Sequence, residues 1–367
     1  MIKEKKEKIY FLDIYRFLCI FAVISIHVTS DPVSKIPVNT WPYFVYYIIN
    51  IGSSFAVPAF LFLSAFVLFY NYEDRWNIKM TKSFFYKRFI STIIPYIIWS
   101  FFYYAVLQVS LGQNIFNEIN KFLIQLFTGK NYAHLYYIIV IAQFYLLFPV
   151  LMGLVKKFPY FRKYLVQFSI IFQIVFFLLN KYFLHIKATG SIFFTYMLFY
   201  CVGAYIGLNY QALKNYLTKK PLRWIIAWII IGIFYIAKGW YGIQNPGFGQ
   251  PLIAYLNFII YYLYVTISSL AIFVISNILY VRWGEKVKIL SQWGRASFLI
   301  YLLHPFVLLC WRHYIIANNS NLYHLLTILA VPMALLVPWI VFLCFNKYKF
   351  AWLFMGNVEA KKQIVKK

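Results

Sequence analysis

The feature of the sequence that most constrains its fold is a series of ten apolar stretches that run from one end of the chain to the other. A hydrocarbon core about 30 Å thick requires roughly 20 apolar residues in a spanning helix, and most of the stretches meet that length. Only 12% of the 367 residues are charged, about half the proportion typical of a soluble domain. We therefore predict an all-α, polytopic integral membrane protein with a single domain over residues 1–367.

The ten predicted spans differ in length. Stretches 43–70 and 252–279 exceed 25 residues, so we expect tilting, a kink or an interfacial continuation there. Pro58 favours a break in the first of these two. Residues 115–127 predict a short amphipathic helix on the outer surface. The spans cover residues 9–29, 43–70, 84–107, 133–155, 164–180, 191–209, 222–240, 252–279, 296–316 and 323–346.

The distribution of Lys and Arg predicts how the chain is oriented. With the N-terminus in the cytoplasm, 27 of the 35 basic residues fall in cytoplasmic segments, seven fall outside, and Arg16 lies within the membrane. Cytoplasmic loops of membrane proteins carry such an excess, so we predict that both termini are cytoplasmic, with a tail from about residue 347. In a soluble protein the net charge of +26 would suggest nucleic acid, but in short loops it indicates contact with anionic lipid.

The first predicted helix carries three ionisable residues, Asp13, Arg16 and His27, although a charge inside a bilayer is costly. Asp13 and Arg16 are three residues apart and close enough to pair. At about 100° per residue His27 returns to within roughly 20° of the Arg16 face, about 16 Å further along the helix. Imidazole is suited to take a proton from a hydroxyl near neutral pH, so we consider the three residues candidates for catalysis. The alternative is an interfacial ion pair and a hydrogen-bonded helix end.

Further candidates for substrate binding lie in later spans. His304 precedes Pro305 inside the ninth span, where the alternative role is to bond a carbonyl freed by the proline. His134 opens the fourth span on the outer side, and the alternative there is the aromatic belt at the interface. Arg312 closes the ninth span on the same side, and for the adjacent His313 we expect the aromatic-belt role.

On the predicted cytoplasmic side, Lys87 and Arg88 open the third span and could hold a polyphosphate; the alternative is an ordinary membrane anchor. Ser64 is buried in the second span, where a serine commonly bonds back to its own helix. No metal or disulfide site is expected, because the four cysteines lie far apart in apolar segments, at Cys19, Cys201, Cys310 and Cys344. A Walker A motif, a dinucleotide fingerprint and a zinc spacing are also absent from the sequence.

Four segments, in order, together resemble the acyltransferase 3 family of integral membrane acyltransferases. FLDIYRFLCIFAVISIH matches the family pattern of Arg, ten residues and His, and VPAFLFLSAFVLFY resembles the family's second-helix signature. HLYYIIVIAQFYLLFPVL and SFLIYLLHPFVL resemble the signatures of the fourth and penultimate helices. The chain departs from the family at Ser64-Ala65, where Ser-Gly is common, and at Ser91 and Thr92, where a second arginine precedes the third-helix proline.

The resemblance implies a bacterial plasma-membrane enzyme that moves an acetyl or succinyl group from cytoplasmic acyl-CoA to a hydroxyl of a surface polysaccharide. It implies that His27 activates the hydroxyl or carries the acyl group, and that Arg16, with Arg88, holds the donor. Partners would be the surface glycan, membrane lipids and a polysaccharide synthase, with no nucleic acid.

Two other functions stay open at this point. The segments LFYCVGAYIGLNY and SFLIYLLHPF are most similar to those of family members from poly-N-acetylglucosamine systems, which have been described both as exporters and as O-acyltransferases. The first alternative is therefore an exporter of such a polysaccharide or of a lipid-linked sugar, with an aromatic-lined path supplied by 34 Tyr and 11 Trp. The second is a non-catalytic partner of a synthase.

Overall fold

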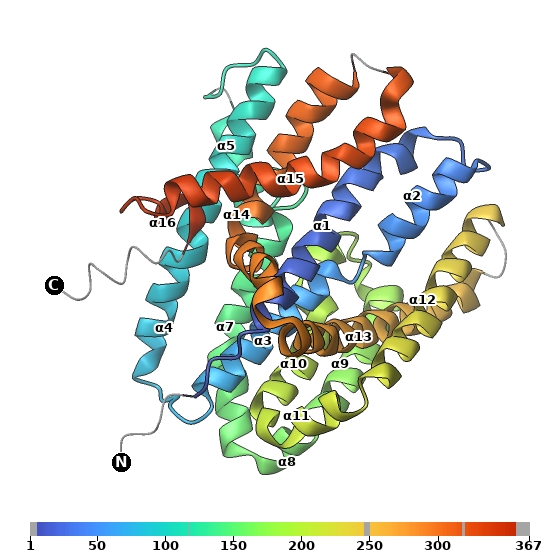
Figure 1. Ribbon diagram of the computed structural model, residues 1–367. Helices are drawn as coiled ribbons and strands as arrows, with labels where there is room; N and C mark the ends of the chain where they lie inside the picture. Colours follow the sequence, from blue (N-terminus) through green and yellow to red (C-terminus); the bar gives the residue numbers. More distant parts are fainter. Residues whose placement is uncertain (1–5, 117, 246–249, 318–319, 357–367) are drawn as a thin grey trace.

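The computed structural model describes residues 6–116, 118–245, 250–317 and 320–356, and within these ranges it contains helices and no strands (Figure 1). Three π-helical turns interrupt or extend helices, at Phe89–Ile93, Asn180–Leu184 and Trp311–Ile316. The α-helices are α1 (Leu12–Lys35), α2 (Trp41–Gly52), α3 (Ala56–Tyr72), α4 (Met80–Arg88), α5 (Ile94–Ser110), α6 (Ile119–Thr128), α7 (Tyr136–Lys157), α8 (Pro159–Lys163), α9 (Leu165–Leu179), α10 (Met197–Leu208), α11 (Tyr210–Lys219), α12 (Pro221–Gln244), α13 (Gln250–Trp283), α14 (Lys288–Cys310), α15 (Tyr323–Phe345) and α16 (Trp352–Met355).

The prediction of an all-α polytopic membrane protein is confirmed. In the described part of the chain, eight helical stretches are long and apolar enough to cross a membrane. One of them, Ala254–Ile316, contains both α13 and α14, and the apolar stretch Phe193–Leu208 is shorter. Each of the ten predicted spans therefore overlaps a helix, while the number that cross the bilayer and their orientation stay predictions.

Several boundaries differ from the predicted ones. The second span is broken at residues 53–55, between α2 and α3, and Pro58 lies in the first turn of α3, where a missing N–H costs no helical hydrogen bond. The helix expected at 115–127 is α6. Helix α14 begins at Lys288, eight residues before the predicted start at 296, because a polar helical segment precedes the apolar run.

Helix α1 lies at the centre of the bundle and contacts α2, α3, α13, α14 and α15 (Figure 1). In α1, 72% of the apolar window is buried inside the protein, against 6% in α12. The exposed side chains of α12 are mainly apolar, as expected for a helix whose neighbour is lipid. The Asp13–Arg16 pair near the start of α1 is therefore held mainly within protein rather than facing the hydrocarbon.

Three glycines permit the closest helix contacts. A Cβ at Gly203 of α10 would lie 2.1 Å from the carbonyl oxygen of Phe62 in α3, and one at Gly207 would lie 2.5 Å from that of Phe66. This Gly-x-x-x-Gly spacing allows two helix backbones to touch in a membrane. A Cβ at Gly294 would lie 1.7 Å from the carbonyl oxygen of Asp13, so α14 approaches α1 equally closely at the ion pair.

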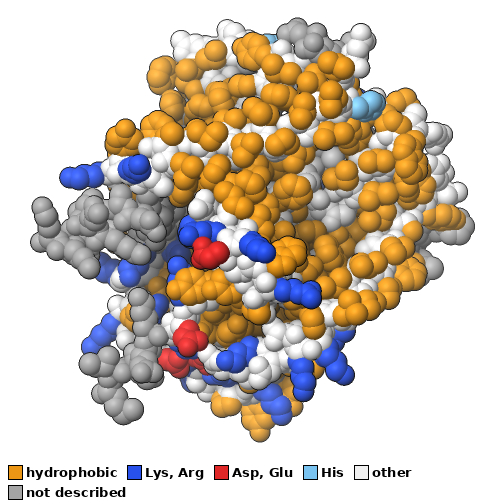
Figure 2. Space-filling view, viewed as in Figure 1, with side chains coloured by type: hydrophobic (Ala, Val, Ile, Leu, Met, Phe, Trp, Pro, Cys, Tyr) orange, Lys and Arg blue, Asp and Glu red, His pale blue; other side chains and the backbone are white. Residues whose placement is uncertain are grey.

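Ion pairs join several segments on the face predicted to be cytoplasmic. Glu73, next to the end of α3, accepts hydrogen bonds from Lys6 at 2.8 Å and from Arg162 of α8 at 2.5 Å. Burial alone would lower the pKa of Lys6, but Glu73 and Asp74 outweigh it and raise that pKa, so the ammonium stays charged. In Figure 2, Lys and Arg gather along the lower and left parts of the visible face, and hydrophobic side chains dominate the upper right.

Candidate functional site

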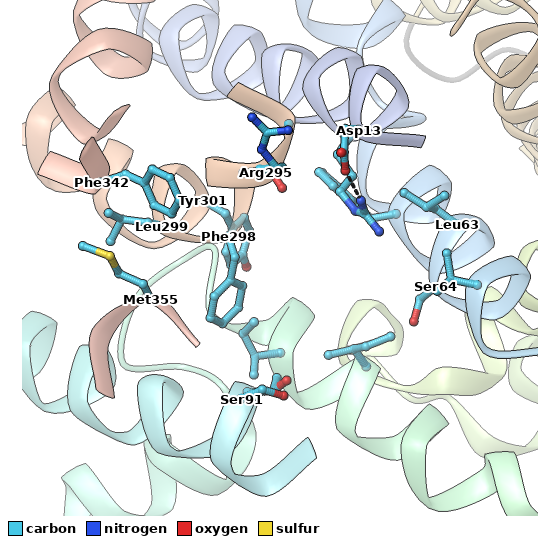
Figure 3. Close-up of a pocket in the computed structure, with 18 of the residues that line it drawn as sticks. Asp13, Leu63, Ser64, Ser91, Arg295, Phe298, Leu299, Tyr301, Phe342 and Met355 are labelled. Carbon is cyan, nitrogen blue, oxygen red and sulfur yellow. Dashed lines mark hydrogen bonds and ion pairs between the residues drawn. The ribbon is translucent and has the colours of Figure 1, made fainter. Parts of the chain in front are cut away.

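A cavity of about 980 Å³ opens within the bundle, near the upper end of the size range of ligand sites (Figure 3). Its walls come from α1, α3, α4, α7, α14, α15 and α16, and from the π turn at Phe89–Ile93. Figure 3 shows Asp13, Ser64, Ser91 and Arg295 around this space. The cavity therefore collects polar side chains from helices that are distant in the sequence.

The Asp13–Arg16 pair of α1 lies on the cavity wall. Arg16 Nη1 donates to Asp13 Oδ1 at 2.5 Å, and the two side chains are 33% and 11% exposed. This contact is the pairing that the sequence predicts. Because the guanidinium of Arg16 reaches the cavity and is only partly used by Asp13, it can also bind an anionic group there.

The cavity is strongly basic. Arg16, Arg88, Arg295 and Lys347 line it, and Asp13 is the single carboxylate among its described lining residues. Arg88 packs its guanidinium over the rings of Phe84 and Tyr145, at 5.3 and 5.1 Å, and its buried Nε has no hydrogen-bond partner in the described part of the protein. A phosphate oxygen would satisfy this donor.

Two other sequence candidates behave differently at the cavity. Ser64 lines it and is half-buried, and among the described residues its hydroxyl makes no hydrogen bond to α3. Lys87 is exposed and does not line the cavity, because adjacent residues on α4 point about 100° apart and Arg88 is the one directed at it. The structure therefore associates Arg88, but not Lys87, with the candidate site.

Three histidines from separate parts of the chain meet deeper in the bundle. The ring centroids of His27 in α1 and His304 in α14 are 5.0 Å apart, and those of His304 and His134 are 5.9 Å apart. His304 is 0% exposed and His134 is 2% exposed, so His134 is not at a lipid interface. His304 Nδ1 bonds the carbonyl of Ile300 at 2.9 Å, a structural role that leaves its Nε2 free for other contacts.

Tyr301 connects the cavity to the histidine cluster, which we define as His27, His134 and His304. Its ring lines the cavity and lies 5.1 Å from the ring of His134 and 6.3 Å from that of His304. The Tyr301 hydroxyl donates to the carbonyl oxygen of His134. Tyr301 thus lies between the basic cavity and two members of the cluster.

Polar residues also surround the far end of α1. Arg312 donates to the carbonyl oxygen of His27, so this sequence candidate lies beside the histidine cluster. Asp31 accepts from Tyr323 at 2.9 Å and pairs with Lys35 at 2.9 Å. This second polar group lies on the side of His27 away from the cavity.

The sequence reasoning did not identify Arg295, Asp31 or Tyr323 as site residues. Arg295 was assigned to a cytoplasmic loop, because the predicted ninth span began after it. Asp31 lies beyond the predicted end of the first span, whereas α1 continues to Lys35. A scan for charges just outside each apolar run would have found Arg295 and Asp31.

Comparison with known proteins agrees with these features. The acyltransferase 3 family model, described as an acyltransferase domain, matches residues 9–343. A Staphylococcus aureus protein named "Probable poly-beta-1,6-N-acetyl-D-glucosamine export protein" is 27% identical over 72% of this chain and 71% of its own length. A Staphylococcus epidermidis protein of the same name is 23% identical over 83% of this chain and 82% of its own. A Bacillus subtilis protein named "Putative membrane-bound acyltransferase YfiQ" is 24% identical over 84% of this chain and 83% of its own length. No solved structure matches significantly.

The family model covers almost the whole chain, so the chain belongs to the acyltransferase 3 family of multi-pass membrane proteins.

Proposed function

We propose that this protein is an O-acyltransferase that moves an acetyl or succinyl group from acyl-CoA to a hydroxyl of a surface polysaccharide. The observation that carries the proposal is a basic cavity lined by Tyr301, whose ring packs against His134 and His304 of the histidine cluster. The family and the acyltransferase relative support the reaction class, and the export-protein relatives support a polysaccharide as the acceptor.

The cavity suits the donor's charged end. Coenzyme A carries phosphates, and Arg16, Arg88, Arg295 and Lys347 supply cations around a space of about 980 Å³. Arg16 and His27 are separated by about 16 Å along α1, which an extended pantetheine arm can span. The acyl end would then approach the histidine cluster past Tyr301.

His27 is the residue that we assign to the acceptor hydroxyl. As the hydroxyl oxygen bonds to the acyl carbon, the carbon–sulfur bond of the thioester breaks and the hydroxyl proton moves to the neutral imidazole. The imidazolium then returns this proton to the thiolate, which leaves as free coenzyme A. The products are the acyl ester and the thiol, so no further reactant is needed.

The test measures surface polymer and its alkali-labile acyl esters separately, in a deletion strain that carries wild type, His27→Ala or His313→Ala. His27→Ala should lower esters per sugar by about 100-fold or more and leave the amount of polymer unchanged. His313 is exposed and outside the cluster, so His313→Ala is the matched control. Membrane levels of each variant are compared by immunoblot.

The alternative function is polysaccharide export, which the names of the staphylococcal relatives favour. If His27→Ala stops polymer from reaching the surface while the remaining polymer keeps its esters, the transferase proposal is wrong and export is supported. If His27→Ala matches wild type in both measurements, His27 serves neither activity.

A further inference from the structure

The hydrogen bond of His304 fixes which of its ring nitrogens carries a proton. Its Nδ1 lies 2.9 Å from the carbonyl oxygen of Ile300, and a carbonyl can only accept a hydrogen bond. Nδ1 therefore carries the hydrogen, and Nε2 of the neutral ring presents a lone pair. That Nε2 is buried and has no hydrogen-bond partner among the residues that the structure describes. A buried acceptor without a partner is costly and calls for an explanation.

His27 is adjacent to this free acceptor. The two imidazole rings lie 5.0 Å apart between centroids and are inclined at 60°, in an edge contact. At this separation a small rotation of His27 brings a ring N–H within hydrogen-bond reach of His304 Nε2. No described residue bonds the ring of His27, so this N–H is not committed elsewhere.

We propose that His304 is a positioning residue that accepts a hydrogen bond from His27 through Nε2, orienting His27 and stabilising it as an imidazolium. The inference rests on the proposed function and adds a residue to its mechanism. His27 then offers its other nitrogen, with a lone pair, to the acceptor hydroxyl. When His27 takes the hydroxyl proton, its contact with His304 becomes a charge-assisted hydrogen bond, which is stronger than the neutral one.

The carboxylates of α1 already have other partners, so neither of them is available to accept the hydrogen bond from His27. Of the carboxylates of α1, Asp13 is paired with Arg16, and Asp31 is engaged by Lys35 and Tyr323.

The other groups that face the two rings are themselves polar or basic. His134 lies 5.9 Å from His304, Arg312 bonds the backbone of His27, and Tyr301 packs beside His304. None of these three side chains carries a negative charge at neutral pH. His304 Nε2 is thus an acceptor at the right place, held by its own helix.

The experiment compares His304→Gln and His304→Phe in the full-length protein in lipid nanodiscs, with His313→Gln as the matched control. The assay follows acetyl transfer from acetyl-CoA to a β-1,6-linked N-acetylglucosamine oligosaccharide as a function of pH. His304→Phe should lower kcat by about 10- to 100-fold, the loss expected for one hydrogen bond to a charged group, with KM for acetyl-CoA nearly unchanged. Glutamine presents an acceptor at a similar reach, so His304→Gln should recover much of that loss.

The pH profile separates positioning from a purely structural role. Activity rises as His27 loses its proton, and removal of the acceptor destabilises the imidazolium, so the acidic limb should move to lower pH in His304→Phe. Equal activity of the Phe and Gln variants with an unmoved acidic limb would overturn the inference while leaving the proposed function intact. If wild type transfers no acyl group to this oligosaccharide and forms no polymer ester in cells, both fail together.

Discussion

Arg295, an exposed residue in the N-terminal half of α14, lines the edge of the cavity close to the Asp13–Arg16 pair (Figure 3). Its neighbour Gly294 is packed directly on the backbone of Asp13, so the position of Arg295 is set by the contact between α14 and α1. Arg16 shares its charge with Asp13, whereas Arg295 has no hydrogen bond or ion pair to a described residue. Of these two arginines, Arg295 is therefore the one with its full charge available to a ligand.

From this difference we predict that Arg295→Gln weakens donor binding. Loss of a hydrogen bond to a charged group costs about 1.5–3 kcal/mol, so KM for acyl-CoA should rise roughly 10- to 100-fold while kcat changes little. Isotope-labelled acetyl transfer by purified protein over a range of donor concentrations measures this. Lys82→Gln removes an exposed charge of α4 outside the cavity and should behave as wild type. Equal effects of the two variants would mean that bulk charge, not the cavity, attracts the donor.

At the residue scale, the sequence was most informative where a charge or imidazole interrupts an apolar run. That pattern identified Arg16, His27 and His304 without knowledge of which helices pack together. It could not predict that His27 and His304, 277 positions apart, lie 5.0 Å apart, because this distance depends on the contact between α1 and α14. It also could not separate Lys87 from Arg88, although adjacent residues on a helix point about 100° apart and, of the two, Arg88 lines the cavity.

At the scale of elements, the contact between α3 and α10 depends on the absence of side chains at two positions. Backbone atoms of α3 occupy the space that a Cβ at Gly203 or Gly207 would need. Because lipid competes with side chains for contacts, helices in a membrane gain most from such close backbone packing. Ser64, on α3, lines the cavity, so this contact also supports one wall of the site.

We predict that Gly203→Ala destabilises the protein, since its Cβ would lie 2.1 Å from the Phe62 carbonyl oxygen and the helices would have to separate. Overpacking of this kind typically costs about 1–3 kcal/mol, seen as a lower midpoint in thermal unfolding followed by size-exclusion chromatography in detergent. Gly153→Ala on α7 is the control, because no atom lies within 4 Å of the position of its Cβ. Helix propensity alone would leave the control neutral or slightly stabilised. A shared midpoint for both variants would refute the packing argument.

The helices themselves were largely predictable, and their ends were not. Apolar length predicted a helix for every span, and the length of the second span together with Pro58 predicted its break. The start of α14 was predicted too late because Lys288 to Arg295 mix charged, polar and apolar residues and were assigned to a loop. Residues in such a segment can still be helical when one face packs against protein, as Gly294 does against α1.

At the scale of the whole molecule, the polar features are arranged along α1. The basic cavity lies near its N-terminal end, the histidine cluster lies further along, and the group around Asp31 lies at the C-terminal end. Such an order suits a donor and an acceptor that approach from opposite sides of a membrane. This order of sites serves the proposed acyl transfer only if the cavity opens to the cytoplasm, where acyl-CoA is made.

The orientation can be tested with single cysteines at Lys121 on α6 and Lys214 on α11, both exposed and separated by three predicted spans. In a background that lacks the four native cysteines, a membrane-impermeant maleimide should label Lys121→Cys in intact cells. It should label Lys214→Cys only after permeabilisation, so each variant is the other's control. Labelling of both from one side would show that a span between them does not cross. The reverse pattern would open the basic cavity to the exterior, away from acyl-CoA, and the donor would then have to be a different anion.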